Sequence, residues 1–405
     1  MDFLSKYPFA TSKSVPEGAD NRGTQLLLQA GFIRQEMAGV YHWLPMGLKV
    51  LRNVERVVRE EMDALGAHEI LMPALGAKER WITTGRWDKI DVLFKLDAAT
   101  GKQYSLNPTH EELVTPLMLE FTRTYKSLPV AVYQIQNKFR NEARAKSGVL
   151  RGREFLMKDM YSFHASQDDL DAWFPKAEEA YRRVYARLGL ADCTVYTLSD
   201  GEPYSKWGYE YQTILPIGED DVHICAKCGL GHNSEIVKGP DFACVKCGAQ
   251  EFRVEKCSEV GNIFKLGTRF SEACGLKVQT ADGKSVVPVM GCYGIGVSRT
   301  LGVIAEKFAD ARGLVWPAGI APYDVYVLVQ GDNLEKAKKL AAQFEAEGKR
   351  ALVDDRDLGF GQKAGDADLF GIPLRAAVTD KTLAAGGWER KLRTQAETTI
   401  VPWAA

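Results

Sequence analysis

Residues 130–164 read VAVYQIQNKFRNEARAKSGVLRGREFLMKDMYSFH, and this stretch says most about the fold. Two apolar runs flank a charged, glycine-containing segment, which predicts two strands joined by a long loop. Where strands and loop meet stand Arg140, Glu142, Arg151 and Phe155. An arginine fork grips phosphate, a glutamate accepts from an adenine amine, and a phenyl ring stacks on a base. By composition alone, a solvated charged hairpin is an equally good interpretation.

The segments around this hairpin predict a domain of mixed α and β structure. Apolar spacing predicts a helix over residues 47–62, followed by a strand over 69–72. A capped helix is predicted over 166–188. Residues 291–296 (GCYGIG) predict a strand with close-approach glycines, leading into a helix at 297–308. Taken alone, these glycines fit backbone packing as well as contact with a ligand.

Beyond a linker at 316–319, strands and helices alternate. Strands are predicted near 325–329, 351–353 and 376–378, with helices near 334–347 and 364–370. Such alternation is typical of a compact domain on a largely parallel sheet.

The composition is that of an ordinary globular protein with several domains. The chain has 405 residues, 45% of them apolar, with 52 basic and 53 acidic side chains. This balance excludes a histone-like polycation but allows a local basic face for nucleic acid. No apolar run reaches the eighteen or so residues that span a bilayer, so membrane insertion is excluded. Residues 1–13 lack the features of an export signal, and a cytoplasmic location is expected.

Half of the eight cysteines form two C-x-x-C pairs, which indicates a metal site. The four are Cys225, Cys228, Cys244 and Cys247. Their spacing predicts a zinc ribbon inside an insertion with its own small architecture at 201–256. Four thiolates fill the coordination sphere, so the zinc is expected to be structural. The remaining cysteines, expected to pack, are Cys193, Cys257, Cys274 and Cys292.

Residues 107–112 (NPTHEE) place a hydroxyl and carboxylates after a proline-fixed turn. A cationic amine would suit Glu111. Alternatively, the segment is a helix N-terminus with Thr109 as its cap and Glu112 at the third position.

Three segments together resemble the signature motifs of the class II aminoacyl-tRNA synthetases. Residues 66–73 with the preceding helix match motif 1, residues 139–155 match motif 2, and residues 294–299 match motif 3. More narrowly, several blocks are similar to bacterial prolyl-tRNA synthetases in a short form without the large editing insertion. These blocks are Arg86-Trp87, 107–112, 151–159, 259–267 and 291–296. The likeness covers nearly the whole chain.

The resemblance implies an α+β catalytic domain, built on an antiparallel sheet flanked by helices, and a C-terminal α/β anticodon-binding domain. The catalytic domain would comprise residues 1–200 and 257–315, interrupted by the zinc-ribbon-like insertion at 201–256. The anticodon-binding domain would comprise residues 322–405. Motif 1 forms the subunit interface in this family, so a homodimer is expected.

The resemblance also assigns roles to single residues. It assigns proline binding to Thr109, Glu111, Arg140 and Asn262. It assigns ATP binding to Arg140, Glu142, Arg151, Phe155, Glu259 and Arg299. Arg140 and Arg299 would be the catalytic residues, and Glu259 lies where relatives contact ATP or its Mg²⁺. Asn262 stands where many relatives have histidine. Asp355, Arg356 and Lys363 lie where the family reads anticodon guanines, although a solvated charged turn is the alternative.

The implied function is ATP-dependent ligation of L-proline to tRNA(Pro) through a prolyl-adenylate, with Mg²⁺ and a structural Zn²⁺. Arginines and Mg²⁺ held where charge develops would lower the barrier without a covalent enzyme intermediate. No editing in cis is expected, and a separate deacylase would then be a further partner. The alternatives are a synthetase for threonine, glycine or histidine, and a regulatory paralogue that binds tRNA without charging it.

Overall fold

The computed structural model describes residues 1–15, 19–145 and 147–403, which form two compact units. One unit consists of residues 38–40 and 55–303, and is called the sheet unit here. The other consists of residues 1–37, 41–54 and 304–405, and is called the terminal unit. Two helices, α2 (Pro45–Ala64) and α7 (Val297–Phe308), contribute residues to both units. Among the residues described, no helix has the length and apolar content needed to cross a membrane.

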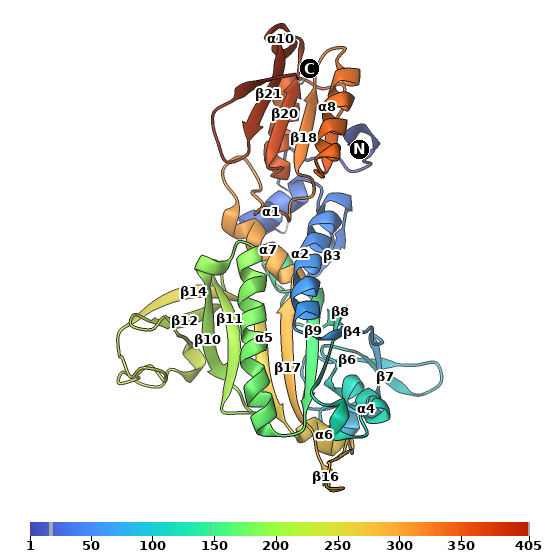
Figure 1. Cartoon of the computed structure of the whole chain (residues 1–405), viewed down its shortest axis with the longest axis vertical. Coiled ribbons are helices and arrows are strands. Elements are labelled where there is room, and N and C mark those ends of the chain that lie inside the picture. The colour runs from blue at the N-terminus through green and yellow to red at the C-terminus, as the bar shows by residue number, and fades with distance from the viewer. Residues whose placement is uncertain (16–18, 146, 404–405) are drawn as a thin grey trace. The chain divides into compact units, whose positions relative to one another are not determined.

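A nine-stranded sheet forms the centre of the sheet unit (Figure 1). In spatial order its strands are β11 (Trp207–Ile214), β10 (Thr194–Asp200), β13 (Gly231–Asn233), β12 (Asp220–Cys225), β14 (Phe252–Gly267), β17 (Val289–Gly296), β9 (Glu154–His164), β8 (Val130–Phe139) and β4 (His68–Glu69). Neighbouring strands are antiparallel except for the pairs β10–β13 and β4–β8. The largely antiparallel sheet that the resemblance implied is therefore present.

Helix α5 (Gln167–Arg187) covers one face of this sheet (Figure 1). It begins as predicted, because the Ser166 side chain accepts a hydrogen bond from the backbone N–H of Asp169. Its rings Tyr181 and Tyr185 pack on Tyr211 of β11, with ring centroids 5.1 and 5.2 Å apart. An apolar cluster that includes Val114, Phe163, Phe270 and Met290 packs against the opposite face of the sheet. Burial on both sides makes the sheet a fixed platform for side chains.

Shorter elements complete the sheet unit. They are β5 (Leu75–Ala77), α3 (Lys78–Thr83), β6 (Phe94–Asp97), β7 (Gln103–Leu106), α4 (Glu111–Phe121), η2 (Tyr125–Ser127), η3 (Gly148–Leu150), η4 (Ala191–Cys193), η5 (Ser234–Ile236), α6 (Arg269–Ala273), β15 (Val278–Gln279) and β16 (Ser285–Val286). The loop predicted between β8 and β9 is present. The strands of the segment 201–256 join the nine-stranded sheet, because β14 runs without interruption from this segment into the centre of the sheet.

The strand predicted over 69–72 is shorter than expected. Only β4 pairs regularly, and the backbone N–H of Ile70 still donates to the carbonyl of Tyr133 at 2.7 Å. At Met72 the side-chain oxygen of Gln134 accepts from the backbone N–H at 2.9 Å. A side chain of β8 thus replaces the backbone ladder, and the segment leaves the sheet there.

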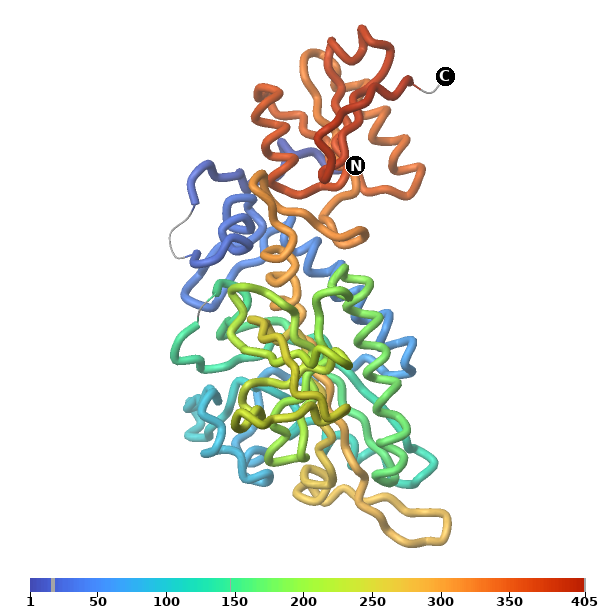
Figure 2. The backbone as a smooth tube through the Cα atoms, turned by 90° about the vertical axis from the view of Figure 1, so that its left-hand side faces the viewer, coloured from blue at the N-terminus to red at the C-terminus, as the bar shows by residue number. Residues whose placement is uncertain are grey.

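The terminal unit holds a six-stranded sheet in the order β1 (Asp2–Phe3), β19 (Ala351–Asp354), β18 (Val325–Val329), β20 (Leu374–Val378), β21 (Gly387–Leu392) and β22 (Thr399–Pro402). The first four strands are parallel and the last two antiparallel, which confirms the α/β prediction. Figure 2 shows the blue N-terminal trace beside the orange and red elements, where β1 extends the sheet. The unit's other elements are η1 (Leu4–Lys6), α1 (Arg22–Gln29), β2 (Ile33–Met37), β3 (Val40–Trp43, whose first residue belongs to the sheet unit), α8 (Leu334–Ala346), α9 (Phe360–Phe370) and α10 (Asp380–Ala384).

Candidate active site

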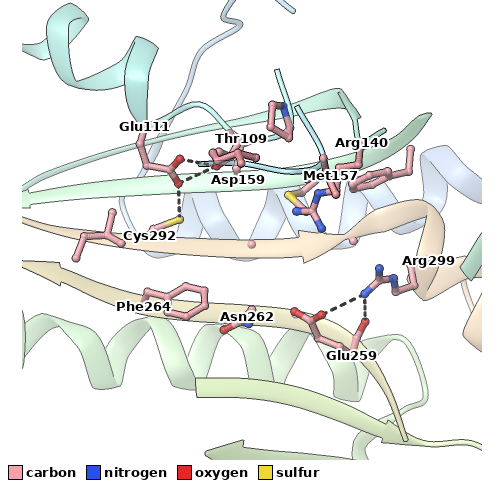
Figure 3. A pocket seen from close by; sticks show the side chains of 18 of the residues that line it. Thr109, Glu111, Arg140, Met157, Asp159, Glu259, Asn262, Phe264, Cys292 and Arg299 are labelled. Carbon is pink, nitrogen blue, oxygen red and sulfur yellow. Dashed lines mark hydrogen bonds and ion pairs between the residues drawn. The ribbon is translucent and has the colours of Figure 1, made fainter. Parts of the chain in front are cut away.

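A cavity of about 380 Å³ lies on the face of the nine-stranded sheet that is turned away from α5. Side chains alternate along a strand, so every second residue of β9 faces this cavity. Phe155, Met157 and Asp159 line it, whereas Lys158 between them donates to the Tyr181 hydroxyl of α5. Strands β14 and β17 and the loop before α4 supply most of the remaining walls (Figure 3). The site is therefore built from segments far apart in the sequence.

Two glycines of β17 keep the floor of the cavity open. Gly294 and Gly296 both line it, at the alternate positions that a side chain would otherwise fill. A Cβ atom built on Gly294 would have the Asn262 carbonyl oxygen at 3.7 Å and the Met157 sulfur at 3.8 Å as its nearest neighbours. The space above this glycine is thus available to a ligand. The structure favours ligand contact over the packing interpretation of this motif.

At one end of the cavity, the Thr109 hydroxyl donates to both carboxylate oxygens of Glu111, at 2.8 and 2.6 Å. Helix α4 begins at Glu111 with His110 as its N-cap residue, and no side chain caps it. The helix-cap alternative for Thr109 is therefore wrong, because its hydroxyl is turned to the carboxylate. The thiol of Cys292 also contacts Glu111, with 3.4 Å between Sγ and Oε1 (Figure 3).

Arg86 also lines this end of the cavity. Its Nη1 donates to Glu111 at 3.2 Å and to both oxygens of Glu112 at 2.8 and 3.0 Å. The Glu112 side chain is buried, and burial raises its pKa to about 7 against the lowering effect of Arg86. The guanidinium also lies over the ring of Phe270, 5.3 Å from the centroid. With Arg86 held on Glu112, the Glu111 carboxylate can accept from a cationic ligand.

Cations line the other end. The Arg140 guanidinium lies over the Phe155 ring, 5.2 Å from its centroid, and points into the cavity (Figure 3). Within the described part of the chain, that guanidinium donates no hydrogen bond to another side chain. Burial, followed by the nearby charge of Arg299, lowers the pKa of Arg140. Arg299 itself donates to the Leu150 carbonyl at 2.7 Å and to the carboxylate of Glu259 at 3.3 Å.

An adjoining hollow of about 230 Å³ shares Arg140, Glu259 and Arg299 with the main cavity. It adds Glu142 and Arg151, which contact each other with 2.9 Å between Oε2 and Nη2. Every residue predicted to bind ATP therefore lines one of two neighbouring spaces. Glu219 and Asp220 also line this hollow, and the sequence analysis did not identify them.

Asn262 lines the main cavity beside a buried acid that the sequence did not reveal. Its Nδ2 lies 3.5 Å from Oε1 of Glu210 on β11, and its Oδ1 is buried without a hydrogen-bond partner in the described structure. Burial, followed by the charge of Glu259, raises the pKa of Glu210 to about 7. The free acceptor of Asn262 is available to a donor on a ligand.

Polar residues at alternate positions in apolar strands are the signal that could have revealed further site residues. Asp159 of β9 lines the cavity, and Arg86 and Cys292 reach Glu111 from other segments. In β8, Gln134 and Lys138 share the face of Arg140 by the same alternation.

The four paired cysteines come together at the outer end of β12 and β14. All four sulfur atoms lie within 4.8 Å of one another, and the pairs Cys225–Cys247 and Cys228–Cys244 are 3.5 and 3.6 Å apart. A tetrahedral zinc with Zn–S bonds of about 2.3 Å requires sulfur atoms roughly 3.8 Å apart. The two C-x-x-C turns have the same form, because the next glycine N–H donates to the first cysteine carbonyl in each. The arrangement fits a four-thiolate metal site.

In the terminal unit, Asp355, Arg356 and Lys363 line one cavity of about 530 Å³. Each already has partners within the protein. Arg356 donates to Asp354 and Asp366, Lys363 Nζ donates to the Val329 carbonyl at 2.6 Å, and Asp355 accepts from the Ser5 hydroxyl at 2.7 Å. These bonds hold the charged groups at the cavity wall.

The main cavity thus presents an acid at one end and arginines at the other. This arrangement suits a ligand with a cationic amine near one end and an anion toward the other. The stacked Phe155 offers a face for a planar base near the arginines.

The sequence of this chain matches two known protein families. Residues 94–308 match the family described as tRNA synthetase class II core domain (G, H, P, S and T). Residues 324–404 match the family described as anticodon binding domain.

Curated relatives match along nearly the whole chain. The proline–tRNA ligase of Bacillus subtilis is 32% identical, with 96% of each chain covered, and that of Acidithiobacillus ferrooxidans is 30% identical, also with 96% of each covered. The first alignment runs over 545 positions, more than the 405 residues here, so the Bacillus protein carries residues that this chain lacks.

Solved structures share the fold. The prolyl-tRNA synthetase of Giardia lamblia in complex with prolyl-adenylate matches with a TM-score of 0.75 at 20% identity, over 93% of this chain and 73% of that one. The prolyl-tRNA synthetase of Cryptosporidium parvum, complexed with halofuginone and AMPPNP, matches with a TM-score of 0.76 at 16% identity. That match covers 94% of this chain and 72% of the other.

Proposed function

The chain belongs to the prolyl-tRNA synthetases and is a proline–tRNA ligase, and from that premise we propose how its cavity carries out the reaction. The observation that carries the proposal is the separation of charge in the main cavity. Glu111 lies at one end, and Arg140 and Arg299 line the other. The matched family includes synthetases for several amino acids. The similarity to proline–tRNA ligases at 30 to 32% identity supports proline as the substrate of this chain.

Proline is held by its secondary amine and its carboxylate. The Glu111 carboxylate and the Thr109 hydroxyl receive the cationic amine, and Arg140 receives the carboxylate. Asn262 and Phe264 line the same cavity and shape the space for the ring. Because Arg86 and Cys292 contact the Glu111 carboxylate, its oxygens are aimed before proline arrives.

ATP occupies the arginine end. Its adenine stacks on Phe155 and its amino group donates to Glu142, while Arg151 and Arg299 hold the outer phosphates. Arg140 bridges the proline carboxylate and the α-phosphate. The carboxylate oxygen attacks the α-phosphorus, the bond to the pyrophosphate oxygen breaks, and the arginines stabilise the charge that builds on both groups. The terminal ribose hydroxyl oxygen of tRNA(Pro) then attacks the carbonyl carbon of the prolyl-adenylate, the bond from that carbon to the phosphate oxygen breaks, and AMP leaves.

Two metal ions accompany this chemistry in our proposal. Glu259 would hold Mg²⁺, since carboxylate oxygens are the ligands that this ion prefers, and the ion would neutralise phosphate charge. The four cysteines would hold Zn²⁺ in a structural role, because four thiolates leave no coordination position for a substrate.

The wider architecture follows the family. We assign residues 1–200 and 257–315 to the catalytic domain, 201–256 to a zinc-bearing insertion and 322–405 to the anticodon-binding domain. Asp355, Arg356 and Lys363 would read guanine edges of the anticodon. The enzyme would act in the cytoplasm as a homodimer through residues 66–73, where the Leu71 side chain is 75% exposed and open to a partner. Editing would be absent in cis and supplied, where needed, by a separate deacylase.

Amino-acid-dependent exchange of pyrophosphate into ATP tests the function directly. Proline should stimulate exchange, and threonine, glycine and histidine should not. Transfer of labelled proline to tRNA(Pro) completes the test. Exchange that responds to threonine alone, or proline exchange without transfer to tRNA, would overturn the assignment.

A further inference from the structure

Behind Thr109 and Glu111 lies a buried group of four polar side chains, which we call the back cluster: His110, Lys138, Asp159 and Tyr161. Each is no more than 2% exposed. Lys138 comes from β8, Asp159 and Tyr161 come from β9, and His110 is the N-cap residue of α4. Polar groups in such a place cost free energy unless they bond one another well.

Ion pairs and hydrogen bonds connect the four side chains of the back cluster. Lys138 Nζ lies 2.7 Å from Oδ1 of Asp159 and 2.8 Å from Nδ1 of His110. The Tyr161 hydroxyl donates to Oδ2 of Asp159 at 3.0 Å. Gln134 donates to the same oxygen at 3.1 Å. The cluster therefore has one well-defined arrangement.

Two of its bonds reach the loop that carries the proline-binding groups. The backbone N–H of His110 donates to the Tyr161 hydroxyl at 2.9 Å, and that oxygen is 3.4 Å from the Thr109 hydroxyl. His110 is the residue between Thr109 and Glu111, so its backbone fixes both neighbours. On its other side, His110 Nε2 lies 3.0 Å from the Pro73 carbonyl oxygen.

The pattern of bonds sets the state of His110. A carbonyl oxygen only accepts, so Nε2 must donate to Pro73, and Nδ1 is left to accept from Lys138. The imidazole is then neutral. Burial, followed by the charge of Lys138, lowers its pKa to about 4, in agreement with that state.

We propose that the back cluster positions Thr109 and Glu111 for the amine of proline. Tyr161 and His110 are then the positioning residues for the imino-acid end of the site. The inference rests on the proposed roles of Thr109 and Glu111. Neither residue needs to touch the substrate, because the backbone N–H of His110 and the carbonyl of Pro73 transmit the constraint.

Steady-state pyrophosphate exchange with the full chain tests this inference. Y161F removes one hydroxyl and leaves the His110 N–H unpaired, and it should raise the KM for proline about tenfold with the KM for ATP unchanged. The matched control is Y293F, which removes another buried hydroxyl, 3.0 Å from Ser162 Oγ, from a strand of the same sheet. Y293F should leave both KM values as they are.

A second pair of variants tests His110. A glutamine amide carries an acceptor and a donor about as far apart as the two ring nitrogens, so H110Q should keep most of the proline affinity. The leucine of H110L can neither donate nor accept a hydrogen bond, so H110L should lose proline affinity as Y161F does. Equal loss in H110Q and H110L would overturn the role of the side chain.

Other outcomes decide the proposal as a whole. An unchanged proline KM in Y161F, equal effects in Y161F and Y293F, or parallel rises in the KM for proline and ATP would overturn it. E111Q, measured alongside, separates the two levels of inference. A raised proline KM in E111Q with none in Y161F removes only the positioning role, whereas no change in E111Q removes the proposed role of Glu111.

Discussion

In the proposed reaction, the Arg140 guanidinium bridges the proline carboxylate and the α-phosphate. It rests on Phe155 and keeps its donors for ligands, whereas Arg299 is already bonded to Leu150 and Glu259. R140A should therefore lower kcat for pyrophosphate exchange by 10²- to 10³-fold, about 3 to 4 kcal/mol of transition-state stabilisation. R140K should recover little, because an ammonium lacks the planar fork. R182A, which alters an exposed arginine of the same unit, is the control and should be fully active.

Lys158 gives a prediction about stability. It is fully buried, it donates to the Tyr181 hydroxyl at 2.6 Å and the Tyr293 carbonyl at 2.9 Å, and burial lowers its pKa to about 7. Between that pKa and the usual value of 10.5 the unfolded chain binds more protons, so this residue makes stability rise with pH. Over that pH range, the free energy of unfolding of the wild type should increase relative to that of K158M by up to about 1.4 kcal/mol per pH unit.

Urea unfolding of both proteins at pH 7, 8 and 9 measures this gain. Groups common to wild type and K158M cancel in the difference. A difference that stays constant across these pH values would show that Lys158 is already charged in the folded chain.

At the scale of elements, β17 works as a floor because its glycines carry no side chains. A Cβ atom on Gly294 makes only ordinary contacts at 3.7 and 3.8 Å, so G294A should fold and keep its melting temperature. G294V should also fold, since valine suits a strand, but its methyl groups extend into the cavity. We expect G294V to lose pyrophosphate exchange far more than G294A does. Equal activity in the two variants would mean that the ligand lies elsewhere.

The four-cysteine cluster ties the turn after β12 to the turn before β14. Removing the proposed zinc ion, by a chelator or by C228S, should lower the melting temperature and leave the KM for proline unchanged. Bound zinc is measured by a colorimetric assay of the unfolded protein. If excess proline slowed metal loss, the metal would have to contact the substrate, contrary to the structural role.

At the scale of the whole molecule, the chain is shorter than the relatives with which it aligns. A proline pocket cannot strongly reject alanine, because the missing methylenes are worth about 1 to 3 kcal/mol. The purified enzyme should therefore form alanyl-tRNA(Pro) and fail to hydrolyse it. The measurement is deacylation of preformed alanyl-tRNA(Pro), with a separate deacylase as the positive control. Hydrolysis by the enzyme alone would contradict the proposal that editing in cis is absent.

Local patterns in the sequence already determined much of this protein. The helix after Ser166 and the alternation after Val325 follow from caps and periodicity, which act over a few residues. The C-x-x-C pairs predicted a four-cysteine site that could hold a metal ion, since ligand spacing within each turn is a local property. The resemblance indicated the family, and the residues that it assigned to ATP and proline binding line the two cavities.

Only the tertiary structure decided how distant segments meet. Strand pairing joined the segment 201–256 to the central sheet, the Gln134 side chain ended the strand at Met72, and the Thr109 hydroxyl turned to Glu111 instead of capping a helix. The back cluster was hidden for the same reason. His110, Lys138 and Tyr161 lie on three different segments, and their burial and bonds exist only once β8, β9 and α4 have packed together. Periodicity encodes which face of an element is buried, but contact between elements depends on register and packing, which no local pattern specifies.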